Sequence, residues 1–282
     1  MSPTVTGAVL DHVAVAVERW SDAWPRYATE LGGAWTSGGM NVGFAPAQLR
    51  YANGGRVEVL QPWDPADNPF LRRFLDRHGP GPHHLTFKVP DLSAALDAAK
   101  QAGFAPVGVD LDNAEWKEAF LHPRQATGIV VQMAQASHDW ESPPPEGFPS
   151  PNAAPASFVR ATHAVARLDT ALALFETLLG GTVRSRGVAP DTTWEFAELT
   201  WASPPRLRLV APTAAGGAST LQEWLGDLPG RLHHLVFAAP DAEAPGRSPG
   251  GAGLDVDGVL PEDGATTVIE PGDNLGTRLV VV

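Results

Sequence analysis

The sequence predicts an α+β fold made of four βαβββ modules arranged in two pairs. Three observations carry this prediction. An apolar strand pattern containing a histidine occurs four times, and glycine-terminated helical segments follow three of the copies. The separation of His12 from His84 also equals that of His163 from His234 to within one residue. An internal duplication of a paired unit explains all three.

Each module opens with the repeated strand pattern. The four copies are LDHVAVAV (10–17), PHHLTFKV (82–89), RATHAVARL (160–168) and LHHLVFAAP (232–240). Their dense apolar residues and short length are typical of buried strands. The spacing places His12, His84, His163 and His234 at corresponding positions of the four modules.

Helices are predicted after the first three of these strands. The segments are SDAWPRYATELGG (21–33), with Ser21 in an N-cap position, DLSAALDAAKQAG (91–103) and LDTALALFETLLGG (168–181). Each has apolar residues at helical spacing and ends in glycine. The fourth copy, DAEAPGRSPGGAG (241–253), is too rich in proline and glycine for a good helix.

The closing strands of the modules repeat as well. RVEVLQP (56–62) matches RLRLVAP (206–212), and residues 122–133 match residues 270–281 with proline and glycine equally spaced. Between the halves, residues 142–155 (SPPPEGFPSPNAAP) are too proline-rich for a helix or central strand. We therefore expect a first domain at 1–138, a linker at 139–157 and a second domain at 158–282.

Composition restricts the function. The absence of cysteine excludes disulfides, thiolate metal ligands and cysteine nucleophiles. The net charge of -12 argues against a nucleic-acid partner, because phosphate contacts require lysine and arginine. No apolar run is long enough for a membrane span, and no secretory leader is evident. We expect a cytoplasmic protein.

Four polar residues have the parity needed to face one cavity in the first half. Side chains alternate across a strand, so a residue of each first strand and one of each last strand can converge. The matching residues are His12 and Glu58 in the first module, and His84 and Gln132 in the second. Two imidazoles, one carboxylate and one amide oxygen suit a divalent metal with open positions.

These motifs resemble the vicinal oxygen chelate superfamily, which includes glyoxalases, epimerases, extradiol dioxygenases and bleomycin-resistance proteins. The first half is most similar to methylmalonyl-CoA epimerase-like proteins, through LDHVAVAV, VEVLQP, PHHLTFKVPDL and FLHPRQATGIVVQM. The resemblance implies a curved, partly closed sheet around a cavity in each half. It places the metal ligands on His12, Glu58, His84 and Gln132, with His83 pointing the other way. The expected cofactor is one divalent metal ion, and these ligand types do not distinguish Fe, Mn, Co, Ni and Zn.

The resemblance also implies chemistry on a small oxygen-chelating substrate, through a metal-stabilised enolate or oxyanion, of isomerase, epimerase or lyase type. Two residues depart from the epimerase pattern. Gln132 replaces a glutamate at the last ligand position, and Asn41 falls where a second acid-base glutamate is expected. An amide cannot act as a base at neutral pH. Glu58 and Glu118 are the remaining catalytic candidates.

The second half carries His163, Arg208, His234 and Val280 at the four corresponding places. A permanent cation and a residue without a lone pair predict that this half binds no metal. It would complete the fold, or bind an anionic ligand through Arg208.

Aromatic residues offer a lining for a substrate pocket. Asn41, Trp63 and Trp116 are candidates for that pocket, although packing explains the tryptophans equally well.

Two alternative functions stay open. One is an extradiol-type dioxygenase, since two histidines and a carboxylate also suit Fe(II), and the other is a non-catalytic small-molecule binding protein of the drug-resistance type. A monomer and a homodimer are both compatible with the duplication.

Overall fold

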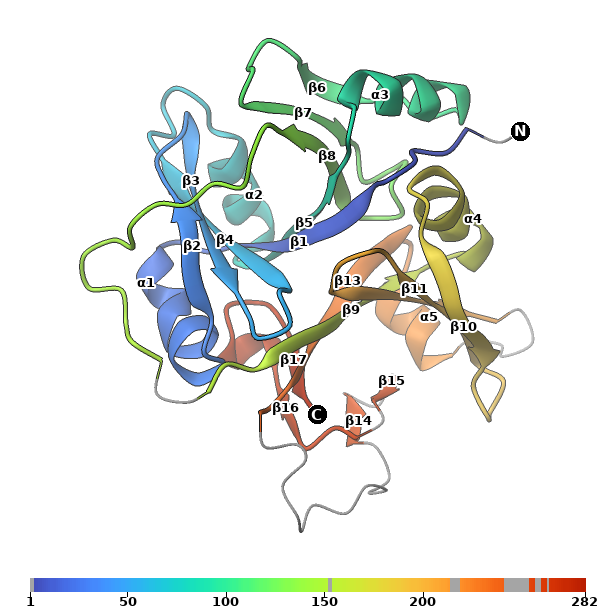
Figure 1. The fold of residues 1–282 in the computed structure, drawn as a ribbon. Helices are drawn as coiled ribbons and strands as arrows, with labels where there is room; N and C mark the ends of the chain where they lie inside the picture. The colour runs from blue at the N-terminus through green and yellow to red at the C-terminus, as the bar shows by residue number, and fades with distance from the viewer. Residues whose placement is uncertain (1–2, 152–153, 214–218, 241–253, 257–259, 263) are drawn as a thin grey trace.

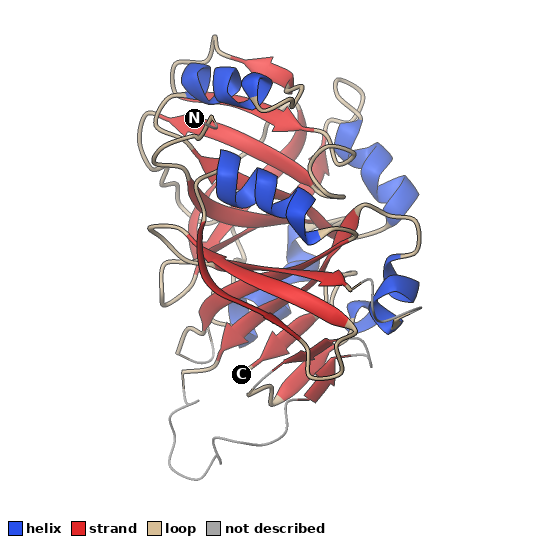
Figure 2. Cartoon of the chain, turned by 90° about the vertical axis from the view of Figure 1, so that its right-hand side faces the viewer, coloured by secondary structure: helices blue, strands red, loops and turns tan. Residues whose placement is uncertain are grey.

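The protein contains two extended β-sheets, one from each half of the chain (Figure 1). This computed structural model describes residues 3–151, 154–213, 219–240, 254–256, 260–262 and 264–282. In Figure 2 the two sheets lie one above the other, with the N-terminus beside the upper sheet and the C-terminus beside the lower one. The α+β class predicted from the sequence is confirmed.

The first half forms an eight-stranded sheet with the order β2-β3-β4-β1-β5-β8-β7-β6. Its strands are β1 (Val9–Ala16), β2 (Ala34–Gly38), β3 (Gly43–Arg50), β4 (Arg56–Trp63), β5 (Gly81–Lys88), β6 (Val107–Asp110), β7 (Trp116–Leu121) and β8 (Val130–Ala136). The antiparallel β1–β5 pair joins the two modules at the centre. The edge strands β2 and β6 do not pair with each other, so the sheet is curved but open.

The second half repeats this plan in a seven-stranded sheet with the order β10-β11-β12-β9-β13-β17-β16. Its strands are β9 (Ser157–Val165), β10 (Thr182–Val188), β11 (Trp194–Thr200), β12 (Arg206–Pro212), β13 (Gly230–Ala238), β16 (Thr267–Ile269) and β17 (Leu279–Val281). In a separate two-stranded sheet, β14 (Leu254–Val256) pairs antiparallel with β15 (Leu260–Glu262). The central β9–β13 pair is the counterpart of β1–β5.

The three predicted helices are present. They are α1 (Trp20–Ala23) continuing into the π-helix η1 (Trp24–Glu30), α3 (Leu92–Gln101), and α4 (Leu168–Leu172) continuing into the π-helix η2 (Ala173–Leu178). Asp91 caps α3 by accepting from the Ala94 amide at 3.1 Å, whereas Arg19, not Ser21, is the N-cap of α1. The predicted non-helical segment 241–253 lies outside the described residues.

Two helices and a 3-10 turn were not predicted. Helix α2 (Phe70–His78) and helix α5 (Thr220–Leu225) each connect the two modules of one half, and η4 (Pro271–Asp273) precedes β17. Helix α2 lies against the sheet face that carries Ala14, Ala16 and Leu60. We call this the inner face of the first half. Among the described residues, no helix has the length and apolarity needed to cross a membrane.

One apolar core extends through both halves. Phe87 of the first half packs against Phe175 and Trp201 of the second, with ring centroids 6.0 and 5.1 Å apart, and Tyr51 packs against Phe237 at 4.9 Å. Buried rings of this size dominate the energetics of packing. The two halves are therefore stabilised by a shared core.

Glycines allow the two backbones to approach closely at two related turns. A β-carbon on Gly128 would lie 1.8 Å from the carbonyl oxygen of Gly230, and one on Gly276 would lie 1.8 Å from that of Pro80. Both glycines also have positive φ angles, of 92° and 73°. No side chain fits at either turn, which explains the glycine repeated in the sequence.

The proline-rich connection between the halves packs along the first half. The Trp35 indole donates to the Ser142 carbonyl at 2.8 Å, and Phe148 lies 5.1 Å from Trp24 between ring centroids. Farther along, the Ala156 carbonyl accepts from the Ala52 amide. The connection thus adds contacts to the α1–η1 and β2 region before β9 begins.

Candidate metal centre

Three predicted ligands converge on the inner face of the first half. His12 Nε2 lies 3.5 Å from Glu58 Oε2, and His84 Nε2 lies 3.7 Å from the same oxygen. Ala14 of β1 pairs with Glu58 of β4 on one side and with His84 of β5 on the other. The parity of the central strands therefore brings one ligand atom of each residue within 4.8 Å of the others.

Irregularities in β1 and β5 put a second polar residue beside each histidine. The register between these strands shifts between Leu10 and His12 and again at Pro82–His84, which leaves Asp11 and His83 as the extra residues of β-bulges. His83 contacts the Phe74 ring of α2 at 4.6 Å between centroids. The expectation that His83 points away from His84 is therefore wrong, because a bulge breaks the alternation of side chains.

Asp11 fixes the orientation of the His12 ring. Asp11 Oδ2 accepts from His12 Nδ1 at 2.7 Å, and Arg56 and Lys88 hold the other carboxylate oxygen at 3.0 and 3.4 Å. Burial opposes the charged imidazole, but the carboxylates of Glu58 and Asp11 raise the pKa of His12 to about 9. At neutral pH the second ring proton therefore lies on Nε2 beside Glu58, and a bound metal would take the place of that proton while Nδ1–H stays on Asp11, as in carboxylate–histidine–metal arrangements.

His84 is oriented by its neighbour in the same way. The Nδ1 atoms of His83 and His84 lie 2.8 Å apart, so one of them donates to the other. Burial lowers the pKa of His83 to about 4, and burial with the adjacent rings of His83 and His12 lowers the pKa of His84 well below its usual value. A neutral His83 can accept the Nδ1 proton of His84, which leaves Nε2 available as a ligand.

The buried nitrogen atoms fit a cation. His12 Nε2 and His84 Nε2 are inaccessible, and neither has a hydrogen-bond partner among the described residues. Burying such atoms without a partner costs free energy, and a metal bound between them and Glu58 would remove that cost. The donor set of two imidazoles and one carboxylate suits a divalent transition metal.

Gln132 and Glu118 extend this group across β8 and β7. Gln132 is 7% exposed and accepts from the Thr86 hydroxyl at 2.6 Å through Oε1, while its Nε2 donates to Glu118 Oε2 at 2.7 Å. The Trp116 indole donates to the same carboxylate oxygen at 2.9 Å. Burial raises the pKa of Glu118. The structure thus brings Gln132, Glu118 and Trp116 together on strands next to the one that carries His84.

Two predicted pocket residues are not brought to this group. Asn41 is exposed in the turn between β2 and β3, where it bridges to Phe44. Trp63 ends β4 at 42% exposure, five residues after Glu58, so the alternation of side chains directs it to the opposite face. His78 is the last residue of helix α2.

The second half carries different residues at the same positions. Arg206 pairs with Arg160 in the way that Arg56 pairs with His12, so Arg160 is the counterpart of His12. Arg208 corresponds to Glu58, His234 to His84 and Val280 to Gln132. The assignment of His163 to the His12 position was wrong by three residues, because the sequence repeat does not fix the register of β9.

His163 instead joins the two halves. Its ring is fully buried on the face of β9 opposite to Arg160, where Nε2 donates to the carbonyl of Thr127 at 2.8 Å. Burial lowers the pKa of His163 to about 4. The contact with Thr127 thus gives His163 a structural role between the two halves.

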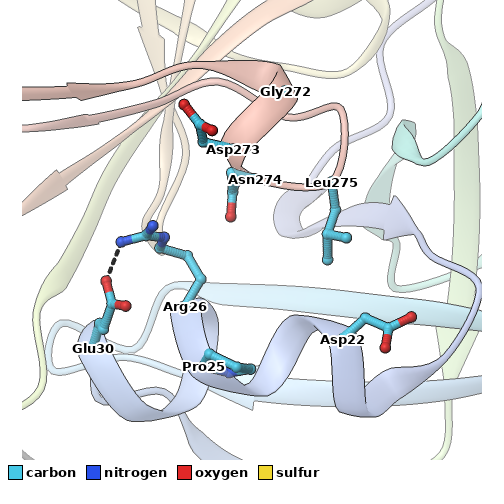
Figure 3. Close-up of a pocket in the computed structure, with 8 residues that line it drawn as sticks. All are labelled: Asp22, Pro25, Arg26, Glu30, Gly272, Asp273, Asn274 and Leu275. Carbon is cyan, nitrogen blue, oxygen red and sulfur yellow. Dashed lines mark hydrogen bonds and ion pairs between the residues drawn. The ribbon is translucent and has the colours of Figure 1, made fainter.

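A small cavity of about 190 Å³ lies away from the metal cluster, at the junction of the halves (Figure 3). It is lined by η1 residues, including Arg26 and Glu30, and by Asp273, Asn274 and Leu275 near η4. Arg26 forms an ion pair with Glu30, and Asn274 donates to the Tyr27 hydroxyl at 3.2 Å. The ion pair lies within η1, whereas the contact of Asn274 with Tyr27 joins the two halves.

The paired modules and the inward-facing His–Glu–His cluster define a protein of the vicinal oxygen chelate class. Comparisons agree: residues 11–120 match the model of the glyoxalase/bleomycin resistance protein/dioxygenase superfamily. The ethylmalonyl-CoA/methylmalonyl-CoA epimerase of Cereibacter sphaeroides is 30% identical over 133 residues, which cover 45% of this chain and 96% of that protein. The chain belongs to this superfamily.

Two further comparisons cover different shares of the chain. The human mitochondrial methylmalonyl-CoA epimerase is 28% identical over 141 residues, which cover 47% of this chain and 79% of that protein. A variant of 4-hydroxymandelate synthase from Streptomyces coelicolor is 16% identical and covers 85% of this chain and 72% of its own, with a TM-score of 0.59. The latter shows that the fold is shared across most of both halves.

Proposed function

We propose that the first half is the active centre of a divalent-metal-dependent enzyme that acts on a small oxygen-chelating substrate. The observation that carries the proposal is the convergence of His12 Nε2, His84 Nε2 and Glu58 Oε2 in a buried group. A divalent ion bound there would supply Lewis-acid polarisation of a carbonyl oxygen. Asp11 and His83 orient the two imidazoles for this purpose.

The reaction proposed is proton exchange at the carbon beside a carbonyl, of isomerase or epimerase type, on an acyl thioester. The support is the similarity of this chain to two acyl-CoA epimerases. Gln132 cannot accept a proton, and Asn41 is exposed away from the cluster. The carboxylates of Glu58 and Glu118 are therefore the candidates for the proton acceptor.

The experiment is solvent exchange. Protein reconstituted with Co²⁺ is incubated with methylmalonyl-CoA in D₂O, and NMR follows loss of the α-proton, with His84→Ala as the control. Exchange by the wild type that disappears in the variant supports the proposal. Absence of exchange with every acyl thioester tested, in protein that binds the metal, would refute this substrate class.

A second candidate is an extradiol-type dioxygenase. Two histidines and one carboxylate on one face also form the usual ligand set of non-haem Fe(II) oxygenases. Oxygen consumption by the Fe(II)-loaded protein with a catechol, without proton exchange, would favour it. Tight ligand binding that persists in EDTA, without turnover, would instead favour a binding protein.

We further propose that residues 1–138 form the metal domain and that residues 158–282 form a degenerate partner domain. Arg160 and Arg208 stand at the positions of two of the ligands. A monomer and a homodimer both fit this division, and sedimentation of the purified protein separates them.

A further inference from the structure

The side chain of Gln132 has two chemically different ends, of which only one can bind a cation. The carbonyl oxygen has lone pairs, whereas the NH₂ group only donates hydrogen bonds. Residue 132 lies on β8 directly opposite Thr86 of β5 and Phe120 of β7. Whether it can contribute a ligand therefore depends on which way the amide is turned.

The neighbours of Gln132 select one orientation. Glu118 Oε2 accepts hydrogen bonds from the Gln132 NH₂ group at 2.7 Å and from the Trp116 indole N–H at 2.9 Å. The indole nitrogen is only a donor, so this oxygen is an acceptor, and the amide must face it with NH₂. Thr86 then donates to the opposite end, Oε1, at 2.6 Å.

The selected orientation directs the oxygen toward the histidines. Oε1 of Gln132 accepts from Thr86 of β5, and Thr86 in turn pairs with His12 of β1, whereas the NH₂ group faces Glu118 of β7 on the opposite side of β8. The carbonyl oxygen therefore lies on the side of the strands that carry His12 and His84.

We propose that Glu118 is a positioning residue that holds the Gln132 amide with its carbonyl oxygen toward the His12–Glu58–His84 group. This inference rests on the proposed function, because the oxygen matters only if the group binds a metal. A glutamine at position 118 both donates and accepts, so it no longer requires the NH₂ end of Gln132, and only the Trp116 indole then favours an oxygen at the shared position. Glu118→Gln therefore weakens the selection while it preserves the size of the side chain.

The test is Co²⁺ affinity by competition titration, together with the visible spectrum of the bound Co²⁺, which reports its ligands. We expect E118Q to weaken binding about 10- to 100-fold and to change the spectrum, as removal of supporting contacts does in metal sites. The exchanged pair E118Q/Q132E returns an oxygen to position 132 and an amide donor to position 118. It should bind within about threefold of the wild type or more tightly.

Glu115→Gln is the matched control, because Glu115 precedes the same strand but is exposed and accepts from Ser137. It should leave affinity and spectrum unchanged. Wild-type protein that fails to bind Co²⁺ would refute the proposed function itself. Wild-type binding with an unaltered E118Q variant would overturn only the role of Glu118. If E118Q does not fold, the exchanged pair decides: binding more than about tenfold weaker than wild type overturns the inference.

Discussion

The inner faces of the two halves have the same backbone register but opposite electrostatics. The first half places His12, Glu58 and His84 where the second half places Arg160, Arg208 and His234. In the first half, two imidazoles and a carboxylate converge without a permanently charged side chain among them. In the second half, the guanidinium groups of Arg160 and Arg208 supply the positive charge. One fold thus carries the proposed metal site in one copy and an ion-pair cluster in the other.

Glu198 is the centre of the ion-pair cluster. Its carboxylate is 5% exposed and lies 3.4 Å from Arg160 and 3.6 Å from Arg208, with Arg206 also in contact. Glu198 pairs with Arg208 as Gln48 pairs with Glu58, so the two residues are counterparts. Permanent guanidinium charges at these positions disfavour a bound metal cation.

The largest expected effect is on metal binding, and it should differ between His84 and His234, which occupy corresponding positions in the two halves. His84→Ala removes a ligand and should weaken metal binding by more than about 100-fold, whereas His234→Ala should change it less than about twofold. Elemental mass spectrometry of protein purified without chelator measures both. Equal loss in the two variants would show that the halves do not differ as described.

The close backbone contacts at Gly128 and Gly276 should be equally sensitive to an added side chain. Gly128→Ala and Gly276→Ala each place a methyl group against a carbonyl oxygen and should lower the free energy of unfolding by more than about 4 kcal/mol. Gly272→Ala is the control, because its β-carbon would meet nothing within 4 Å. Urea unfolding measures all three, and a mild effect of either first variant would contradict the close approach.

Breaking the ion-pair cluster should cost more than the matched change in the first half. Glu198→Ala leaves the buried Arg160 and the half-buried Arg208 without their shared carboxylate and should destabilise the protein by about 3 to 5 kcal/mol. Gln48→Ala removes a 3.3 Å contact with His12 Nδ1 and should cost less than about 1 kcal/mol. Urea unfolding of both variants tests the contrast, and equal losses would contradict it.

The smallest effect concerns pH. Burial lowers the pKa of His163 from 6.5 to about 4, so between these values the unfolded chain binds a proton that the folded protein does not. Stability should therefore fall as pH decreases from 6.5 to 4, by roughly 3 kcal/mol from this residue. His163→Gln keeps a donor for Thr127 and should remove that part of the slope. An unchanged slope in the variant would assign the acid sensitivity to other groups.

The sequence by itself determined the fold class, the four strand repeats and three helices, because apolar periodicity and glycine ends are local signals. It also selected His12, Glu58 and His84, since strand parity and the repeat spacing agree at these positions. It did not predict α2 and α5, which connect modules outside the repeat.

Tertiary structure alone decided the register and the supporting contacts. The bulges at Asp11 and His83 insert single residues into the β1–β5 pair, and the assignment of Arg160 in place of His163 follows from pairing between β9 and β12. The contact of Gln132 with Glu118 joins two strands. Strand pairing is a non-local interaction, and a shift by a single residue reverses the face of every side chain, so no local pattern could specify these features.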